Sequence, residues 1–421
     1  DISVYVRARP LLPHELERGL AASVFAEDRT ASVHVPQTTV RGESSVQVQE
    51  FKADNVYGPD SCNDTIYEQA VRKLVGFALK GGLATVFAYG QTGSGKTFTL
   101  TAFEASVSKD LFDLELLQQW IPGASHDDFE IHLSFFEILG KNAVDLLSER
   151  APVKILEDHF RAIQVLGARE VHVRSTNELQ QLIQSAVQLR RTEETSKNAT
   201  SSRSHAICRL RIVNKSVSEA EDGVLYLIDL AGSESHGDSK YHDKERMKET
   251  REINTSLSVL KDCIRNRVLA IYSDKFVHIP YRNSKITHLL KDTFEISSMR
   301  ATQTVVFANV SPSSDDVSQT VNTLRYVGAL RIPVPKLQPA PNPADPSTWS
   351  NATLSQWVRE KSPKSLVRPE ILCPTESGRQ LLRVPESEFI QRCKQCDPKI
   401  TDRAAHLFYI ELWKLMVDAR T

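Results

Sequence analysis

Apolar and polar positions along the chain follow two periods, one typical of strands and one typical of helices. Two segments, Leu83 to Tyr89 and Gly223 to Asp229, are almost wholly apolar, as expected for central strands that are covered on both faces. Further strands are predicted at 2–7, 129–136, 153–156, 170–173, 205–213 and 302–309. Short alternating runs between Val33 and Val48 indicate a hairpin or an excursion from the sheet.

Apolar residues three and four positions apart predict helices between these strands. Thr65 to Leu79 carries such a stripe and stops at Gly81-Gly82. The other helices are expected at about 106–120, 177–190, 246–267, 282–292 and 318–330. Strands that alternate with helices are typical of an α/β domain with a central sheet.

A proline-rich segment, residues 332–346, divides the chain. Six of its fifteen residues are proline, which favours extended backbone and marks a domain boundary. We therefore expect a large domain at 1–331, a linker at 332–346 and a helical module at 347–421. The module carries Trp349, Trp357, Gly378 to Leu382, Phe389, Leu407 to Tyr409 and Leu412. In this pattern it resembles a sterile-alpha-motif or pointed-type bundle, with a generic helical domain as the alternative, and its aromatic residues are expected in its core.

Composition excludes little, but it adds several expectations. The net charge is −1, with 40% hydrophobic and 25% charged residues, so any polyanionic partner must be met by a local patch rather than by overall charge. Six scattered cysteines indicate reduced thiols in an intracellular protein, and Cys393-x-x-Cys396 lacks the second ligand pair that a zinc site needs. No run of eighteen apolar residues is present, so no membrane span is expected. The chain begins at Asp1 without Met, as an excised piece would.

The stretch after the first apolar strand matches the G-x-x-x-x-G-K-[ST] phosphate loop. Its residues are Gly90, Gln91, Thr92, Gly93, Ser94, Gly95, Lys96 and Thr97. Glycines let the backbone N–H groups approach phosphate oxygens, and the following helix N-terminus favours negative charge. Lys96 is expected to reach the β- and γ-phosphates, and the Thr97 hydroxyl to bind Mg²⁺.

Two later stretches extend this site. Asn198 to His205 is a polar loop that enters a strand, and Asp229 to Glu234 follows the second apolar strand. A carboxylate at a strand end can hold a metal-bound water opposite a phosphate loop. Gly232 lets a backbone N–H approach the γ-phosphate.

In this order and spacing, the three stretches resemble the phosphate loop, switch I and switch II of kinesin motor domains. The resemblance covers about residues 1–331 and is supported by Val4 to Pro10, Ile253 to Leu257 and His278 to Lys285. It implies an α/β P-loop NTPase with a central, mostly parallel or mixed eight-stranded sheet flanked by helices.

The resemblance also implies roles for single residues. Arg7, Arg9 and Pro10 match the motif beside adenine, Arg203 and Glu234 match the ion pair between the switches, and Ser202 matches the hydroxyl on the metal. The implied catalytic residues are Ser201, Ser202, Arg203, Gly232 and Glu234. The implied ATP-binding residues are Arg7, Arg9, Pro10, Gly90, Gln91, Thr92, Gly93, Ser94, Gly95, Lys96, Thr97, Phe98 and Asn198. The implied metal site, for the Mg²⁺ that accompanies ATP or ADP, is Thr97, Ser202 and Asp229.

Tubulin is the implied partner, and its acidic surface calls for a local basic face. Arg282 and Lys285 match a tubulin-contacting loop, and Lys240 and Lys244 lie in the segment after switch II. Acidic residues alternate with the latter pair, so a solvated mixed-charge helix remains the alternative there. Residues 347–421 are a candidate site for a protein partner, and no nucleic-acid partner is expected.

Within the family, 154–158, 252–265 and 322–326 look most like the internal-motor kinesins that depolymerise microtubules. Their Lys-Val-Asp loop tip is absent, because Thr38 to Arg41 stands in its place. Prolines also replace the neck linker of walking kinesins, and the segment after Thr97 leaves little room for the family's loop 5.

The function expected from these observations is microtubule-stimulated ATP hydrolysis in the cytoplasm, on the cytoskeleton, that produces movement or end depolymerisation. The alternative is a microtubule-binding scaffold with a weak or regulatory nucleotide site. A helicase or a small GTPase is disfavoured, because the chain has no Asn-Lys-x-Asp guanine signature and no aromatic-studded basic groove.

Overall fold

The computed structural model describes most of the chain, in ten ranges. They are 2–38, 44–159, 161–197, 203–215, 221–233, 244–272, 276–295, 300–330, 342–363 and 366–419. The chain divides into two compact units, one made of 1–214 and 222–337 and the other of 215–221 and 338–421. The division at 337–338 falls in the expected linker, of which residues 332–341 lie outside the described residues. The three-part division of the chain stays a prediction.

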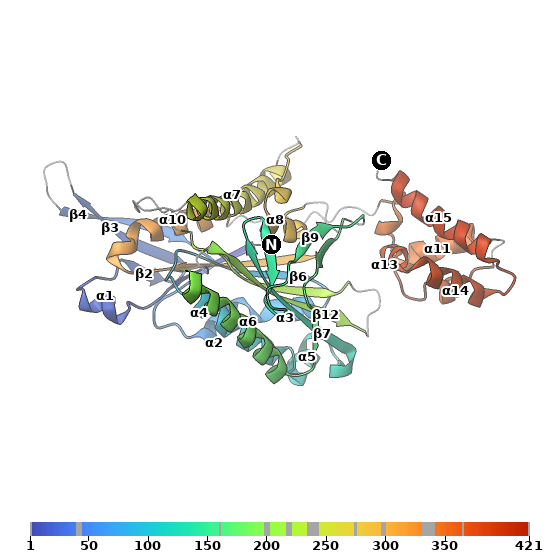
Figure 1. Ribbon diagram of the computed structural model, residues 1–421, viewed down its shortest axis with the longest axis horizontal. Helices are drawn as coiled ribbons and strands as arrows, with labels where there is room; N and C mark the ends of the chain where they lie inside the picture. Colours follow the sequence, from blue (N-terminus) through green and yellow to red (C-terminus); the bar gives the residue numbers. More distant parts are fainter. Residues whose placement is uncertain are drawn as a thin grey trace. The chain divides into compact units, whose positions relative to one another are not determined.

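The larger unit is organised around a mixed sheet (Figure 1). Its strand order is β11-β7-β12-β13-β6-β14-β1-β5, with β8 paired to β7 at the side. The bounds are β1 (Ile2–Ala8), β5 (Asn55–Tyr57), β6 (Leu83–Tyr89), β7 (Phe129–Leu139), β8 (Asn142–Asp145), β11 (Val171–Val173), β12 (His205–Asn214), β13 (Gly223–Asp229) and β14 (Thr302–Val310). The strands β13, β6, β14, β1 and β5 are parallel, whereas β12, β7 and β11 pair antiparallel.

The sheet separates two hydrophobic cores, and the alternation within β6 shows why. Phe87 and Tyr89 join one core, while Val86 and Ala88 join the other. In Figure 1 the first core is covered by α7 (Lys244–Tyr272), α8 (Lys285–Leu289), α9 (Lys291–Phe294) and α10 (Val317–Gly328). The second is covered by α2 (Asn63–Ala70), α3 (Arg72–Leu79), α4 (Lys96–Asp110), α5 (Leu114–Trp120) and α6 (Thr176–Lys197). Every residue of β6 is buried, because both faces of the strand are covered.

Smaller elements lie around this sheet. The short helix α1 (Pro13–Glu17) is followed by a three-stranded sheet of β2 (Val24–Glu27), β3 (Thr30–Thr38) and β4 (Ser44–Lys52). The strands β9 (Lys154–Glu157) and β10 (Ile163–Leu166) form a separate pair. The β3–β4 pairing confirms the hairpin expected between Val33 and Val48, whereas residues 39–41 of its tip lie outside the described residues.

Three predicted helices are each divided in the structure. The helix expected at 65–79 breaks at Val71, where Leu74 donates to the Val71 carbonyl and tightens one turn. The helix expected at 106–120 breaks before α5, because the Asp113 side chain caps Leu116 instead of continuing the turn. The segment at 282–292 forms α8 and α9 with a break at Leu290. The helix α4 runs without interruption from the phosphate loop to Asp110.

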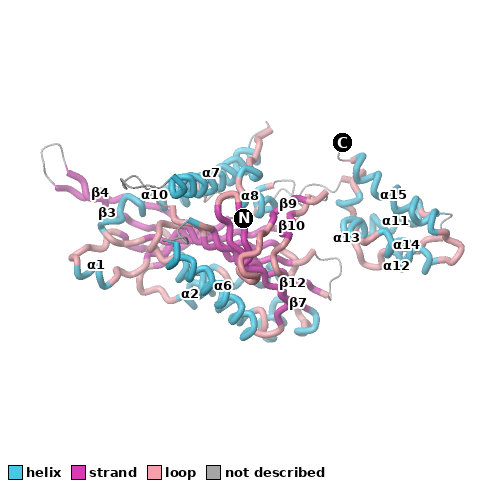
Figure 2. The backbone as a smooth tube through the Cα atoms, viewed as in Figure 1, coloured by secondary structure: helices cyan, strands magenta, loops and turns pink. Residues whose placement is uncertain are grey.

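The smaller unit is helical, as its aromatic and apolar spacing predicts (Figure 2). Its helices are α11 (Asn351–Lys361), α12 (Pro369–Leu372), α13 (Gly378–Arg383), α14 (Glu386–Cys396) and α15 (Asp402–Asp418). Trp357 stacks on Phe408 with ring centroids 4.9 Å apart, and Phe389 packs beside the same ring, so these aromatics form the core. Cys393 is buried, and no cluster of metal-binding side chains exists among the described residues. None of the helices that the structure describes could cross a membrane.

Candidate nucleotide-binding site

The loop between β6 and α4 has the backbone shape that phosphate binding requires. Gly93 and Gly95 have φ of +77° and +94°, a region that residues with a Cβ adopt rarely. At Gly90 a Cβ would lie 2.1 Å from the Asn309 carbonyl oxygen, so no larger residue fits between β6 and β14. Lys96 is the first residue of α4, which places the helix N-terminus at the end of the loop.

A cavity of about 480 Å³ opens over this loop. It is lined by Arg9, Pro10, Leu12, Thr92, Gly93, Gly95, Lys96, Thr97, Phe98 and Asp229. Parts of the chain that are far apart in sequence therefore meet at one site, among them Arg9, Pro10 and Asp229. The Phe98 ring is 65% exposed at its rim and offers a flat apolar surface.

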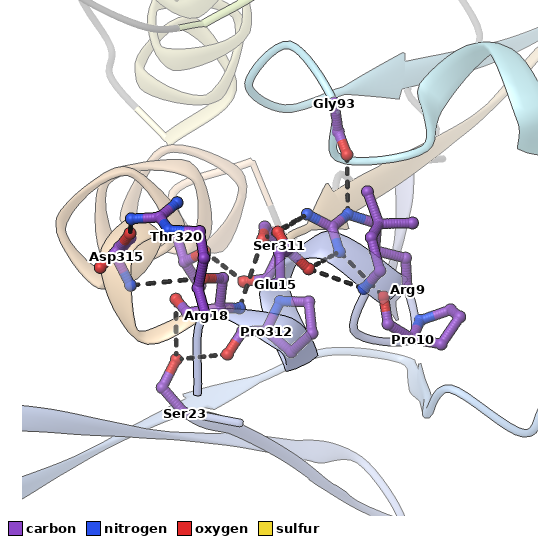
Figure 3. A network of polar contacts seen from close by, with 12 residues as sticks. Arg9, Pro10, Glu15, Arg18, Ser23, Gly93, Ser311, Pro312, Asp315 and Thr320 are labelled. Carbon is purple, nitrogen blue, oxygen red and sulfur yellow. Dashed lines mark hydrogen bonds and ion pairs between the residues drawn. The ribbon is translucent and has the colours of Figure 1, made fainter. Parts of the chain in front are cut away.

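Arg9 supports the loop from below (Figure 3). Its Nε donates to the Gly93 carbonyl at 2.7 Å, and its two terminal nitrogens donate to the Glu15 carboxylate at 2.8 and 2.6 Å. The hydrogen bonds from Arg9 lower the pKa of Glu15 to about 2. Arg9 thus connects α1 to the phosphate loop.

Arg7 is anchored differently from Arg9. It is buried, and it donates to the Thr99 hydroxyl at 2.9 Å. Its guanidinium carbon lies 5.3 Å from the centroid of the Phe98 ring. Arg7 therefore holds Phe98 at the rim of the cavity.

Two charged side chains meet the polar end of the cavity. The Lys96 ammonium donates to the carbonyls of Gly90 and Gln91 at 3.0 Å each. The Thr97 hydroxyl donates to Asp229 Oδ2 at 2.7 Å, while Asp229 Oδ1 is buried and has no hydrogen-bond partner within the described residues. A hydroxyl beside a carboxylate with an unsatisfied oxygen is a donor set that suits a hard cation such as Mg²⁺, so the residues present fit that ion.

Arg190 of α6 also contacts Asp229, although it was not among the expected site residues. It donates to Asp229 Oδ2 at 2.9 Å and to the Ser204 carbonyl at 3.2 Å. Its Nε lies 3.5 Å from Glu137, a buried carboxylate of β7 that also accepts from Arg150 at 2.8 Å and from the Ser204 hydroxyl. The signal in the sequence is the basic pair Arg190-Arg191 at the end of the helix predicted at 177–190, which the structure extends to Lys197.

Glu104 was missed as well. It is buried in α4 and lines a second cavity, of about 250 Å³, together with Thr97, Arg190 and Asp229. Burial, and then the charge of Asp229, raise the pKa of Glu104 to about 8. Nothing in the sequence around Glu104 indicates that its carboxylate lies close to Asp229.

The two switch segments are described in part. Ser233 donates through its backbone N–H to the Gly90 carbonyl at 3.1 Å, so the segment with Gly232 lies beside the phosphate loop. Arg203 is half-buried and lies two residues before the start of β12. Asn198, Ser201, Ser202 and Glu234 lie outside the described residues.

The comparisons with known proteins agree with this geometry. The family model described as "Kinesin motor domain" matches residues 7–331. The chain belongs to the kinesin motor family. This confirms the recognition made from the phosphate loop and the two switch stretches.

Curated relatives of this kinesin match over nearly four fifths of the chain. The diatom spindle kinesin-1 of Cylindrotheca fusiformis is 36% identical over 79% of this chain and 50% of its own length. The kinesin-like protein KIN-13B of Arabidopsis thaliana is 37% identical over 78% of this chain and 47% of its own length. The mouse kinesin-like protein KIF24 is 36% identical over 78% and 24%. The chain thus spans about half the length of these relatives, or less.

A solved structure gives the same fold. It is described as the C-terminal motor and motor homology domain of Kar3Vik1 fused to a synthetic heterodimeric coiled coil. It matches with a TM-score of 0.64 and 29% identity over 79% of this chain and 85% of that chain. The predicted fold class, a mixed sheet of about eight strands flanked by helices with C-terminal helices after it, is confirmed.

The residues expected on the polymer-binding face of this kinesin differ in exposure, and only some of them are described. Arg282 is largely exposed, but its guanidinium donates to Glu157 at 2.7 Å. Lys285 is half-buried at the start of α8. Lys240 lies outside the described residues, and Lys244 begins α7 without a described side chain.

Proposed function

We propose that this chain hydrolyses ATP with Mg²⁺ and couples the reaction to binding of microtubules, producing movement or end depolymerisation. The observation that carries the proposal is the single cavity in which Arg9, the phosphate loop and Asp229 meet. The family membership supplies the reaction and the partner. The cytoskeleton is the corresponding location.

The phosphate loop holds the triphosphate in this proposal. Its backbone N–H groups and the N-terminus of α4 face the phosphates, and Lys96 exchanges the carbonyls of Gly90 and Gln91 for phosphate oxygens. The base rests on Phe98 and Pro10 at the rim of the cavity, with Arg9 holding the loop in place.

Thr97, Ser202 and Asp229 would hold Mg²⁺, which neutralises charge on the phosphates during phosphoryl transfer. The Gly232 N–H senses the γ-phosphate, because its segment already lies beside Gly90. Arg203 and Glu234 close the site behind the attacking water, and Ser201 lies in the same loop as Arg203. These roles are proposed from the family's motif.

Helix α7 connects the site to the polymer in the proposal. It follows switch II in the chain, and its described exposed side chains include Arg251, Lys261 and Arg265, which outnumber the exposed carboxylate of Asp262. A basic exposed face of this kind complements the acidic microtubule surface. Arg282, Lys285, Lys240 and Lys244 are proposed to belong to the same face, and residues 347–421 to bind a protein partner.

Steady-state ATP turnover of the full chain, measured with and without taxol-stabilised microtubules, tests the proposal. We expect turnover to rise at least tenfold with polymer, and to be lost in both conditions in Lys96→Ala. Equal rates with and without polymer would overturn the coupling, and polymer binding without turnover would instead favour the scaffold. Imaging single filaments in ATP then separates sliding from shortening.

A further inference from the structure

His205 connects three parts of the motor that are separate in sequence. It is the first residue of β12, and its ring is 2% exposed. Its Nδ1 accepts a hydrogen bond from the backbone N–H of Ala231 at 3.0 Å. Its Nε2 lies 2.8 Å from the hydroxyl of Ser256, in α7.

The direction of each bond follows from the groups involved. A backbone N–H can only donate, so Nδ1 of His205 carries no proton. The Ser256 hydroxyl donates to the Ile253 carbonyl at 2.7 Å, so its oxygen accepts from the proton on Nε2. The chain Ala231 to His205 to Ser256 to Ile253 therefore has one consistent set of donors, and only the neutral imidazole with its proton on Nε2 completes it.

Each end of this series of hydrogen bonds belongs to an element with a role in the proposed function. Ser204, beside the ring, is fixed by Arg190 through its carbonyl and by Glu137 through its hydroxyl. Ala231 precedes Gly232, whose N–H is proposed to sense the γ-phosphate. Ser256 is 6% exposed and lies five residues from Arg251, on the helix proposed to meet the polymer.

We propose that His205 is a positioning residue that couples the switch II segment to helix α7. When the Ala231–Gly232 backbone shifts toward the γ-phosphate, the rigid imidazole carries that shift to Ser256, because both ring nitrogens are engaged. The ring itself touches neither nucleotide nor polymer. The proposal rests on the proposed function, and the two measurements below test the response to nucleotide and the response to polymer separately.

Two substitutions of His205 separate the effect of its bond to Ala231 from the effect of its bond to Ser256. His205→Asn keeps an acceptor where Nδ1 lies and loses the bond to Ser256, whereas His205→Gln keeps a donor near Nε2 and loses the bond to Ala231. Ser256→Ala removes the α7 end alone, and Ser258→Ala, at an exposed position of the same helix, is the matched control. Thermal unfolding checks that each variant is folded.

The first measurement is hydrogen exchange of the α7 backbone in the ADP state and in the state with a non-hydrolysable ATP analogue. We expect the exchange protection of residues 251–271 to differ between the two states in the wild type and in Ser258→Ala. His205→Asn, His205→Gln and Ser256→Ala should lose most of that difference. Folded His205→Asn and Ser256→Ala with the same exchange difference as the wild type would overturn the proposal. Equal exchange of α7 in the two nucleotide states of the wild type would overturn it as well.

The second measurement is ATP turnover with and without microtubules. We expect Ser256→Ala, which leaves the imidazole and both switch stretches in place, to lose polymer stimulation by about fivefold or more, the lower range of coupling between sites, with basal turnover and analogue affinity within twofold of the wild type. A parallel loss of basal and stimulated turnover would mark a structural role and overturn the proposal. A wild type without stimulation would count against the proposed function alone, because the exchange experiment still decides the role of His205.

Discussion

The guanidinium of Arg190 donates to the carboxylate of Asp229 at 2.9 Å, on the same oxygen that accepts the Thr97 hydroxyl at 2.7 Å. Both side chains of the ion pair are less than 10% exposed, at 8% and 9%. A helix on one side of the sheet thus holds the residue at the end of the central strand β13. The two switch stretches are joined through this contact, because Arg190 also binds the Ser204 carbonyl.

Arg190→Ala is expected to destabilise the protein by about 3 kcal/mol, because it leaves the buried carboxylates of Asp229 and Glu137 without this cation. Urea unfolding in the presence of ADP measures the change. Arg191→Ala, at the exposed neighbouring position, is the control and should change the free energy of unfolding by less than about 0.5 kcal/mol. Equal stabilities of the two variants would contradict the structural role of the Arg190–Asp229 pair.

Glu15→Gln is expected to lower stability by about 2 kcal/mol and to weaken ATP binding, because Arg9 loses its bidentate partner and holds the Gly93 carbonyl less firmly. Chemical unfolding and titration with a fluorescent ATP analogue measure the two effects. Glu17→Gln, on the exposed side of the same short helix, should leave both values near those of the wild type. Wild-type affinity for the ATP analogue in Glu15→Gln would contradict the role of the Arg9–Glu15 pair in supporting the phosphate loop.

The pH dependence of stability should report the neutral state of His205. Burial, and then the charge of Arg190, lower the pKa of this imidazole to about 4 from its ordinary 6.5. The unfolded chain therefore binds a proton near pH 6.5 that the folded chain takes up only near pH 4. Stability that is present above pH 6.5 is lost as the pH falls through this window.

His205 alone should account for about 2 kcal/mol of the loss between pH 7 and pH 5. His205→Asn removes the titrating group, so its stability should fall less steeply over the same range. Urea unfolding at pH 7, 6 and 5 compares the two proteins. Parallel slopes would mean that His205 is protonated in the folded protein or accessible to water.

Glu234→Ala is expected to abolish hydrolysis and to spare ATP binding, because the residue is proposed to act in the proton relay behind the attacking water rather than on the phosphates. Single-turnover hydrolysis and analogue titration separate the two steps. Turnover that persists in the variant would remove Glu234 from the mechanism.

Much of the fold could be predicted because its signals are local. The almost wholly apolar segments at Leu83 to Tyr89 and Gly223 to Asp229 are the adjacent central strands β6 and β13. The glycines of the phosphate loop have positive φ as their spacing implied. Helix breaks at Val71 and Asp113 were missed, since a single turn tightened by one hydrogen bond or one side-chain cap leaves the apolar stripe intact.

The rest of the site depends on contacts between distant segments. Arg190 and Glu104 lie on different helices, and only the packing of α4 against α6 brings both to Asp229. Glu137 is a buried carboxylate in β7, and its partners come from three other parts of the chain. Periodicity identifies which face of an element is buried, but it does not say which buried polar groups pair.

The central claim is that nucleotide turnover in the cavity beside Asp229 is coupled to binding of a polymer. ATP turnover of the wild-type chain, titrated with microtubules from zero to saturation, tests it most directly, with Lys96→Ala as the inactive control. The account predicts a saturable rise of at least tenfold in the wild type and no turnover in the control. A wild-type rate that stays flat across the titration would contradict it.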